Sequence, residues 1–288
     1  MESDQYGDCE VMLTAITRAV SPSIQECELT FIERQRVDVP RAIQQHTAYE
    51  KCLTELGVRV VSLPAQAELP DAVFIEDTAV VVDEVAVVAS MGAVKRRREI
   101  QSLVDTLSYF RPLKFLNASA TLEGGDVVRV GRTLYVGSSR RTNCEGIAQL
   151  RALLEPYDYD VKPVQVRGCL HLTTGCTYIG RDTLLVNPYW VDTSPLTDVN
   201  VIEVPSNEPW AANGLEIGGV IILSSSFPET RKLLEERSYQ VRVLNISELE
   251  KAEAGLTCMS LIFDSDKPTL DVITCLASSI ELSEGLRR

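Results

Sequence analysis

The segment Asp126-Val127-Val128-Arg129-Val130-Gly131-Arg132-Thr133-Leu134-Tyr135-Val136-Gly137 consists of two apolar runs on either side of a Gly-Arg pair. Runs of this kind around a short turn that contains glycine are typical of a β-hairpin. The same pattern of strand, polar or glycine turn and strand occurs three more times, at residues 78–89, 177–186 and 215–223. The sequence therefore predicts four hairpins, which we treat as units of a repeat.

The segments that follow these hairpins also recur. Three hairpins precede a stretch with helical periodicity and then a short apolar run. The helical stretches are residues 93–109, 142–155 and 228–238, and the apolar runs are residues 112–116, 159–166 and 240–246. The hairpin at 177–186 leads instead into a loop, 187–199, and a strand, 201–204. The repeated unit is therefore a hairpin, a connection that is usually helical, and a third strand.

A fifth unit can be assembled from the two ends of the chain. Residues 257–263 and 11–16 have the pattern of hairpin strands, and residues 40–56 and 59–63 supply the helix and the third strand. A spacing of roughly 40–50 residues between equivalent turns is typical of propellers and arrays. A ring that is closed by joining the termini leaves no open sheet edges. We therefore expect residues 1–288 to form one α/β propeller domain with pseudo-fivefold repeats around a central channel.

The rival interpretation is a doubly wound α/β sheet. That fold expects single strands that alternate with helices, and its first strand is followed by a glycine-rich phosphate-binding turn. This sequence has hairpins in place of single strands and lacks such a turn. The pattern therefore favours the ring.

Composition restricts the class of partner. The chain carries 28 Lys and Arg residues against 41 Asp and Glu residues, a net charge of −13. Such acidity argues against binding nucleic acid or an anionic membrane, and it suits a cationic small molecule. No segment has the roughly 20 continuous apolar residues of a membrane span, and the acidic N-terminus is unlike a secretory signal. We expect a cytoplasmic protein, with monomer and homodimer both open.

Eight cysteines are spread along the chain without the spacing of a zinc site, so we expect reduced thiols and no metal. Cys52 and Cys275 are predicted to pack in helices, and Cys169 and Cys176 to be core residues. Cys258 attracts more interest, because it lies in the apolar segment Gly255-Leu256-Thr257-Cys258-Met259-Ser260 and opens a predicted strand.

A nucleophilic thiol requires a partner that handles protons, and the chain has only two histidines, His46 and His171. His46 lies within a predicted amphipathic helix, whereas His171 precedes the third hairpin, and catalytic groups are usually placed on loops. Glu76-Asp77 and Glu123 open the first two hairpins. Because equivalent loops of a ring converge on its channel, we expect these acids, His171 and Cys258 to meet at one end of it.

Five segments, in order along nearly the whole chain, carry a specific resemblance. They are Leu69-Pro70-Asp71-Ala72-Val73-Phe74-Ile75-Glu76-Asp77, Thr121-Leu122-Glu123-Gly124-Gly125-Asp126-Val127, Ser139-Arg140-Arg141-Thr142-Asn143, Leu170-His171-Leu172 and Leu256-Thr257-Cys258. Together they resemble the dimethylarginine dimethylaminohydrolase family, guanidine-modifying enzymes of the pentein superfamily. The resemblance implies the five-bladed pentein fold and an enzyme without metal or organic cofactor.

The resemblance also implies a reaction: hydrolysis of an Nω-substituted L-arginine, most simply a methylated one, to L-citrulline and an amine. Cys258 is implied to attack the guanidinium carbon and form a covalent thiouronium intermediate. His171 is implied to protonate the departing amine and then to activate water. Asp77 and Glu123 are implied to orient the guanidinium, and Glu123 also the imidazole.

The remaining implied positions bind the rest of the substrate. They are Leu29, Asp71, Glu76, Asp77, Arg96, Arg141 and the backbone of Ala252. Asp71 and Glu76 are implied to hold the ammonium and guanidinium ends. Arg96 and Arg141, whose planar forks suit carboxylates, are implied to take the substrate carboxylate or to brace the surrounding loops. Leu29 belongs to a lid expected between residues 28 and 36.

Several alternatives stay open. Arginine and agmatine deiminases carry His-x-Asp, whose carboxylate holds a terminal guanidinium nitrogen, whereas this chain has His171-Leu172-Thr173. The missing carboxylate favours an N-substituent over a bare NH₂, but Nω-hydroxyarginine suits the same geometry. A pentein-fold binding protein would not need a thiol, an imidazole and paired acids at the loop positions. An amidinotransferase is expected to be longer.

Overall fold

The computed structural model describes residues 11–267, so Cys9 and Cys275 lie outside the described part of the chain. These residues form five sheets of three strands each. The sheets are β3 (Ala79–Val81), β4 (Ala86–Val88), β5 (Leu113–Phe115); β6 (Val127–Val130), β7 (Thr133–Ser138), β8 (Asp160–Gln165); β9 (Cys176–Tyr178), β10 (Thr183–Val186), β11 (Asn200–Glu203); β12 (Leu215–Ile217), β13 (Val220–Ser224), β14 (Gln240–Leu244); and β15 (Ser260–Ser265), β1 (Met12–Arg18), β2 (Arg59–Leu63).

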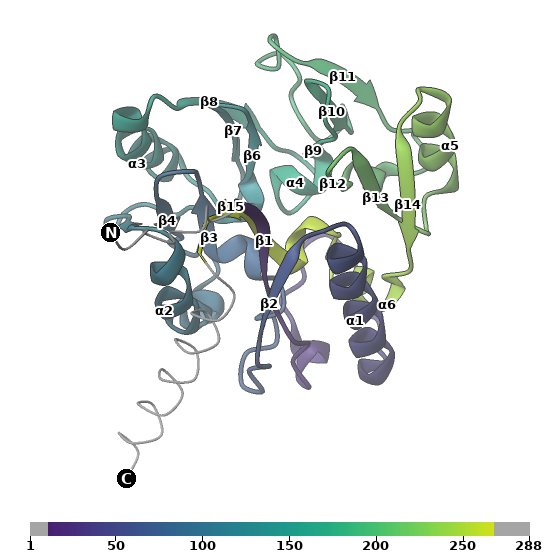
Figure 1. Cartoon of the computed structure of the whole chain (residues 1–288), viewed down its shortest axis with the longest axis horizontal. Helices are drawn as coiled ribbons and strands as arrows, with labels where there is room; N and C mark the ends of the chain where they lie inside the picture. The colour runs from purple at the N-terminus through teal and green to yellow at the C-terminus, as the bar shows by residue number, and fades with distance from the viewer. Residues whose placement is uncertain (1–10, 268–288) are drawn as a thin grey trace, which may run out of the picture.

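All five sheets share one connectivity. In each sheet, in the order given above, the second strand pairs antiparallel with the first strand and parallel with the third. A parallel return requires a crossover, which is usually a helix. Four sheets have one: α1 (Val39–Glu55), α2 (Gln101–Phe110), α3 (Cys144–Leu154) and α5 (Pro228–Glu236). These helices lie on the periphery of the ring (Figure 1). The sheet of β9, β10 and β11 uses the loop at 187–199, as predicted.

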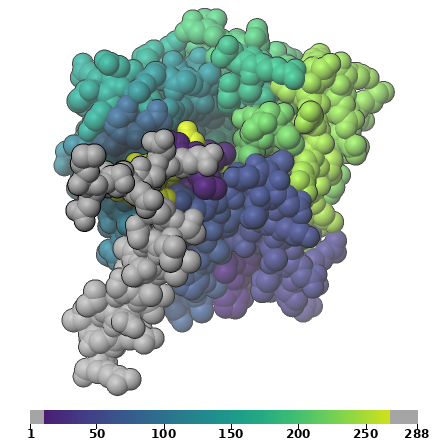
Figure 2. Space-filling model, in the orientation of Figure 1, coloured from purple at the N-terminus to yellow at the C-terminus, as the bar shows by residue number. Residues whose placement is uncertain are grey.

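The ring closes through the sheet that combines the two ends of the chain. There β1 pairs antiparallel with β15, with Ile16 opposite Leu261, and parallel with β2, with Ile16 opposite Val61. In the space-filling view the successive segments follow one another around the visible face in order of colour (Figure 2). The prediction of a five-unit α/β ring with a fifth unit shared by the termini is confirmed.

Five hydrophobic clusters hold the ring together, and each contains residues from two successive sheets. One of them joins Ile16 and Leu261 of the closing sheet to Ala79 and Ala86 of the next sheet, against α2. Each sheet therefore buries its apolar side chains against the two neighbouring sheets of the ring. None of the helices formed by residues 11–267 combines the length and apolar character needed to cross a membrane.

A short helical turn precedes the first strand of every sheet. In chain order the turns are η2 (Ile75–Thr78), η4 (Gly124–Asp126), α4 (Leu172–Gly175), η6 (Pro209–Ala212) and η7 (Thr257–Met259). The predicted hairpin-opening residues lie on these turns or directly beside them. The fold thus places Asp77, Glu123, His171 and Cys258 at equivalent positions of four units.

The sequence placed the start of the last strand three residues too early. It predicted a strand over 257–263, but β15 begins at Ser260, and Cys258 lies on η7 before it. The cause is tertiary. The Thr257 N–H donates to Asn213 Oδ1 and the Thr257 hydroxyl donates to Glu76 Oε2, so these donors serve neighbouring turns and not the strand ladder.

Ring closure through β1 has a testable consequence. Ile16→Ala removes a side chain that is 0% exposed between two sheets, and such a deletion should lower the free energy of unfolding by about 2–5 kcal/mol. Ile43→Ala, on the 46% exposed position of α1, is the matched control and should change it by less than about 0.5 kcal/mol. Urea denaturation would measure both. Equal effects would contradict the packing described here.

Candidate active site

The imidazole of His171 lies between two buried carboxylates. His171 directly precedes α4 and is 2% exposed. Its Nε2 lies 2.7 Å from Glu123 Oε2, and its Nδ1 lies 3.5 Å from Asp77 Oδ1. Both ring nitrogens therefore face an anionic oxygen, an arrangement that favours a ring protonated at both nitrogens.

The charges of this trio are strongly interdependent. Burial lowers the pKa of His171, but Asp77, Glu123 and Asp126 outweigh burial and raise the pKa to about 9. Burial raises the pKa of Glu123, but the hydrogen bond and charge of His171, together with Arg96 and Arg141, bring that pKa down to about 2. At neutral pH the site therefore holds an imidazolium and an ionised Glu123.

Two glycines allow the trio to pack this closely. A Cβ atom on Gly125 would lie 2.5 Å from Asp77 Oδ1 and 2.9 Å from His171 Nδ1. A Cβ atom on Gly124 would lie 2.0 Å from the backbone oxygen of Glu76. The motif Glu123-Gly124-Gly125 thus brings one turn against the next with no side chain between them.

Asp77 is fixed from its other side by an arginine. Arg96 is 3% exposed, and its NH1 donates to Asp77 Oδ2 at 2.6 Å while its NH2 donates to Glu99 Oε2 at 2.9 Å. Arg141 is placed behind the second carboxylate, with its NH1 3.4 Å from Glu123 Oε1. Each carboxylate that faces His171 therefore has a guanidinium near it.

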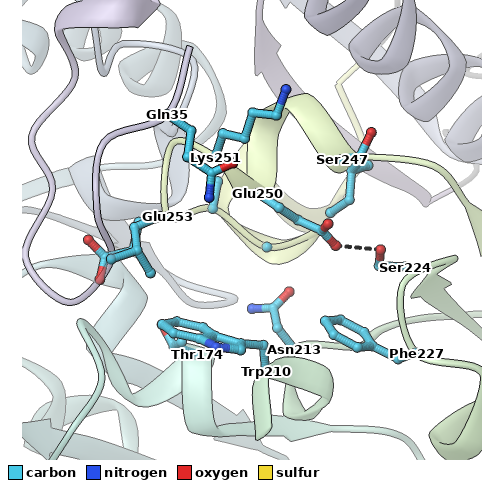
Figure 3. Close-up of a pocket in the computed structure, with 14 residues that line it drawn as sticks. Gln35, Thr174, Trp210, Asn213, Ser224, Phe227, Ser247, Glu250, Lys251 and Glu253 are labelled. Carbon is cyan, nitrogen blue, oxygen red and sulfur yellow. Dashed lines mark hydrogen bonds between the residues drawn. The ribbon is translucent and has the colours of Figure 1, made fainter. Parts of the chain in front are cut away.

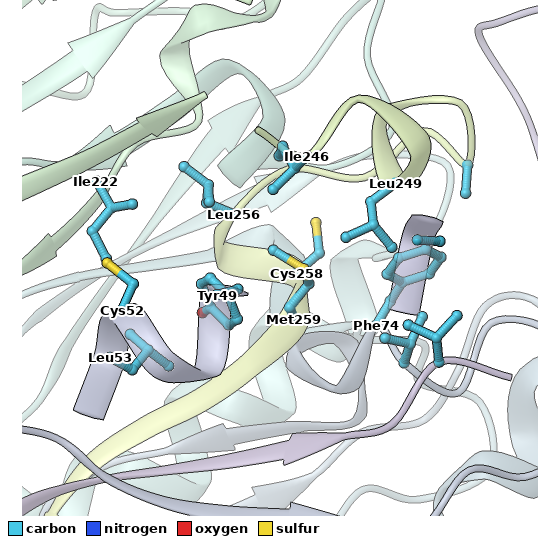
Figure 4. Packing of buried hydrophobic residues seen from close by; sticks show 14 of the residues in the cluster. Tyr49, Cys52, Leu53, Phe74, Ile222, Ile246, Leu249, Leu256, Cys258 and Met259 are labelled. Atoms are coloured by element: carbon cyan, nitrogen blue, oxygen red, sulfur yellow. The ribbon is translucent and has the colours of Figure 1, made fainter. Parts of the chain in front are cut away.

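The candidate nucleophile lies at the margin of a hydrophobic cluster. Cys258 is 8% exposed and packs with Phe74 and Leu249 (Figure 4). The Gly255 N–H donates to its sulfur at 3.3 Å. Burial, followed by the charges of Glu76 and Asp77, raises the pKa of Cys258 well above its usual value. The sulfur is therefore a neutral thiol at pH 7 until a nearby positive charge stabilises the thiolate.

Glu76, the neighbour of Asp77 on η2, is half-buried and has its own set of partners. Its Oε2 accepts the Thr257 hydroxyl at 2.9 Å and the Thr173 hydroxyl at 3.5 Å. Burial, with a further contribution from Asp77, raises the pKa of Glu76 to about 8. Glu76 lines a cavity of about 230 Å³ in the central channel, together with residues of β3, β6, β12 and β15.

One narrow cavity contains most of the predicted site residues. Its walls include Asp71, Asp77, Arg96, Arg141, His171, Ala252 and Cys258, together with Glu28, Phe74, Leu170, Thr174, Glu253 and Ala254. The centre of a water molecule can occupy only about 10 Å³ of this cavity. That volume is room for about one water molecule. Three predicted site residues do not line it. Leu29 packs on the cluster around Phe74, Glu123 lies behind His171, and Glu76 faces the channel.

A larger cavity adjoins this one and shares Thr174, Glu253 and Ala254 with it. About 330 Å³ of it is open to the centre of a water molecule, and Trp210 and Phe227 are among its walls (Figure 3). It contains neither the thiol nor the imidazole. The chemistry therefore belongs to the narrow cavity.

The sequence reasoning missed residues that connect the turns. Asn213 donates to the Thr173 backbone oxygen at 2.9 Å and to the Thr257 hydroxyl at 3.0 Å, so it ties the histidine turn to the cysteine turn. The repeat could have indicated Asn213, because this residue closely precedes the fourth hairpin, as the other site residues precede theirs. Glu99, which pairs with Arg96, gave no such signal, because an acid three residues away on a helical stretch usually faces solvent.

The trio of Asp77, Glu123 and His171 is also the one group in residues 11–267 with donor atoms close enough for a metal ion, all within 4.8 Å. Both ring nitrogens of His171 already face carboxylates. A metal would therefore have to displace a proton from a ring whose pKa is about 9.

Comparisons with known proteins agree with this geometry. Residues 28–262 match the family model described as "N,N dimethylarginine dimethylhydrolase, eukaryotic". The chain belongs to the dimethylarginine dimethylaminohydrolase family. Among its members, N(G),N(G)-dimethylarginine dimethylaminohydrolase of Pseudomonas aeruginosa is 34% identical over 82% of this chain and 93% of the relative. The Streptomyces coelicolor protein of the same name is 33% identical over 86% and 95%.

Solved structures extend the comparison to the fold. A cysteine-to-serine variant of the Pseudomonas aeruginosa dimethylarginine dimethylaminohydrolase, complexed with citrulline, superposes with a TM-score of 0.83 at 32% identity, over 88% of this chain and all of that one. The N-terminal domain of ArgZ, an arginine dihydrolase from cyanobacteria, shares the fold at 17% identity with a TM-score of 0.74. The predictions of family, of pentein fold and of a hydrolase of C–N bonds are confirmed.

The raised pKa of Cys258 predicts how the thiol should respond to pH. Iodoacetamide reacts with the thiolate, so the alkylation rate of Cys258 should rise about tenfold per pH unit between pH 7 and pH 9. Peptide mass spectrometry would follow Cys258, and the exposed Cys144 shows that the reagent is active. A rate at Cys258 that is constant above pH 7 would show that the sulfur is already ionised.

Proposed function

We propose that residues 1–288 form one catalytic domain that hydrolyses Nω-methylated L-arginine to L-citrulline and a methylamine. One observation carries this proposal: a neutral thiol, Cys258, and a protonated imidazole, His171, face the same narrow, acid-lined cavity. A thiol next to a proton donor in an acidic cavity suits a cationic electrophile with an amine as leaving group.

The cavity offers a complementary group for each part of an arginine. Asp71 is 6% exposed and takes the α-ammonium, together with the backbone oxygen of Ala252. Arg141 takes the α-carboxylate, because its guanidinium keeps only 3.4 Å contacts with Glu123. Arg96 is already engaged by Asp77 and Glu99, so it braces Asp77 and does not bind the carboxylate.

The guanidinium enters between Asp77 and Cys258, with Glu76 beneath. Its positive charge offsets the carboxylates that raise the pKa of Cys258, so the thiol loses its proton to solvent as the substrate binds. The sulfur then attacks the central carbon. His171 donates a proton to the substituted nitrogen, the C–N bond breaks, and a neutral amine leaves a covalent thiouronium on Cys258.

The second half of the reaction reverses the role of the imidazole. His171, now neutral, takes a proton from water, and the hydroxide adds to the thiouronium carbon. Collapse of this adduct breaks the C–S bond and forms the urea group of citrulline, while the hydroxyl proton passes to the departing sulfur and restores the neutral thiol of Cys258. Glu123 holds Nε2 throughout, so Nδ1 is the nitrogen that exchanges the proton.

The residue at position 173 favours a substituted nitrogen. Where deiminases are expected to place a carboxylate, this chain places the Thr173 hydroxyl, which points to Glu76 Oε2. A terminal NH₂ gains no charged partner there, whereas a methyl group loses nothing.

A citrulline assay with a substrate panel tests this proposal. Citrulline should form from asymmetric dimethylarginine and monomethylarginine with kcat/KM at least about tenfold above that for arginine, hydroxyarginine or agmatine. Cys258→Ser should lose at least about a thousandfold in kcat, while Cys144→Ser, at an exposed thiol, should match the parent protein. Faster turnover of hydroxyarginine or arginine would reassign the substrate.

The covalent intermediate has its own test. His171→Gly removes both the proton donor to the departing amine and the group that activates water, so turnover should slow and the thiouronium that still forms on Cys258 should persist. Intact-protein mass spectrometry after acid quench should show the adduct, and its absence from Cys258→Ser would locate it. Full activity of His171→Gly without any adduct would remove His171 from the mechanism.

A further inference from the structure

A short helix next to the catalytic cysteine ends with an unexpected residue. After α6 (Ser247–Glu250), the Ala254 N–H donates to Leu249 O at 3.3 Å and the Glu253 N–H donates to Glu250 O at 3.0 Å. These two bonds define a Schellman motif, whose left-handed residue is usually glycine. Here that residue is Glu253, with φ of 60°. A non-glycine residue holds this conformation against a steric cost, which points to a use for its side chain.

The side chain of Glu253 reaches the lid, residues 28–36. Its Oε2 accepts the Thr30 N–H at 2.6 Å, and its Oε1 accepts the Phe31 N–H at 2.9 Å. Glu253 is 7% exposed. One carboxylate thus fixes two adjacent lid amides through charge-assisted hydrogen bonds. Because these contacts are to the backbone, they hold whatever side chains the lid carries.

The position of Glu253 connects the lid to the reaction centre. Glu253 follows Ala252 directly, and two residues later the Gly255 N–H contacts Cys258 Sγ. Glu253 also lies where the narrow and the large cavity adjoin. In Figure 3 its carboxylate points away from Glu250, whose own carboxylate bonds Ser224. Within one short loop, therefore, two glutamates serve different partners.

The narrow cavity is too small for a substrate to enter while the lid is in this position. Its free space of about 10 Å³ holds about one water molecule. The lid also contacts the site elsewhere, since the Glu28 N–H donates to Asp71 at 3.1 Å. Because the cavity has no room for a substrate in this state, the lid has to move before a substrate can enter.

We propose that Glu253 is a positioning residue that latches the lid shut over the catalytic cavity, through the backbone amides of Thr30 and Phe31. The consequence for substrate binding rests on the proposed function; the latch itself does not. If the latch is weakened, a larger share of the protein has an open lid. The KM should then rise by the reciprocal of the fraction of protein that stays closed, with a smaller change in kcat.

A matched pair of Glu→Gln variants isolates the latch. In Glu253→Gln one amide oxygen can still accept an N–H, but the amide NH₂ faces the other N–H, donor against donor. In Glu250→Gln both partners, Ser224 and Ser226, are hydroxyls that can accept as well as donate. Hydrogen exchange at Thr30 and Phe31, measured without substrate, should accelerate at least about tenfold in Glu253→Gln and stay unchanged in Glu250→Gln.

Glu253→Gly separates the latch from a role in stability. Glycine suits the left-handed position, so thermal unfolding should occur at or above the temperature of the parent protein, while lid exchange should accelerate even more than in Glu253→Gln. In both variants the KM should rise by the reciprocal of the fraction of protein that stays closed, a fraction that the exchange rates give. Unchanged exchange at Thr30 and Phe31 in both variants would overturn the latch. An inactive parent protein would overturn the proposed function and leave the exchange result standing.

Discussion

The site depends on one constraint: an imidazole held between two buried carboxylates. Burial alone would make His171 neutral, and buried acids alone would take up protons. Together they keep one another charged, with the pKa of His171 near 9 and that of Glu123 near 2. The neighbouring features follow from this arrangement. Arg96 and Arg141 balance the carboxylates, and Gly125 leaves the space in which the three groups meet.

The repeat explains how groups far apart in the chain come together. Each unit begins with a short helical turn before its first strand, and these turns contact one another around the channel. Four units contribute Asp77, Glu123, His171 and Cys258, and the fifth contributes Asn213, which ties two of the others. Because each sheet is buried by its neighbours, the distances between these groups are set by the whole ring.

The sequence was sufficient for the fold and for many of the residues that line the narrow cavity, but not for the pairings among them. Hairpins and helices follow from local periodicity, so the ring could be predicted, and the residues that open the hairpins could be expected to converge. Whether Arg96 faces a substrate or a carboxylate of its own chain depends on its tertiary contact with Asp77, 19 residues away, which no spacing reveals. Glu253 lies in no motif that the sequence analysis singled out. Its left-handed backbone and its bonds to the lid, more than two hundred residues away, exist only in the folded chain.

The protonation state of His171 in the free protein tests the central claim most directly. Nitrogen-15 NMR of the histidine rings is tractable, because the chain has only two. His46 serves as internal reference, since burial lowers its pKa below the usual value. The account predicts that at pH 7.5 both ring nitrogens of His171 carry a proton while His46 is neutral, and that His171 titrates near pH 9. A neutral His171 at pH 7.5 would contradict it.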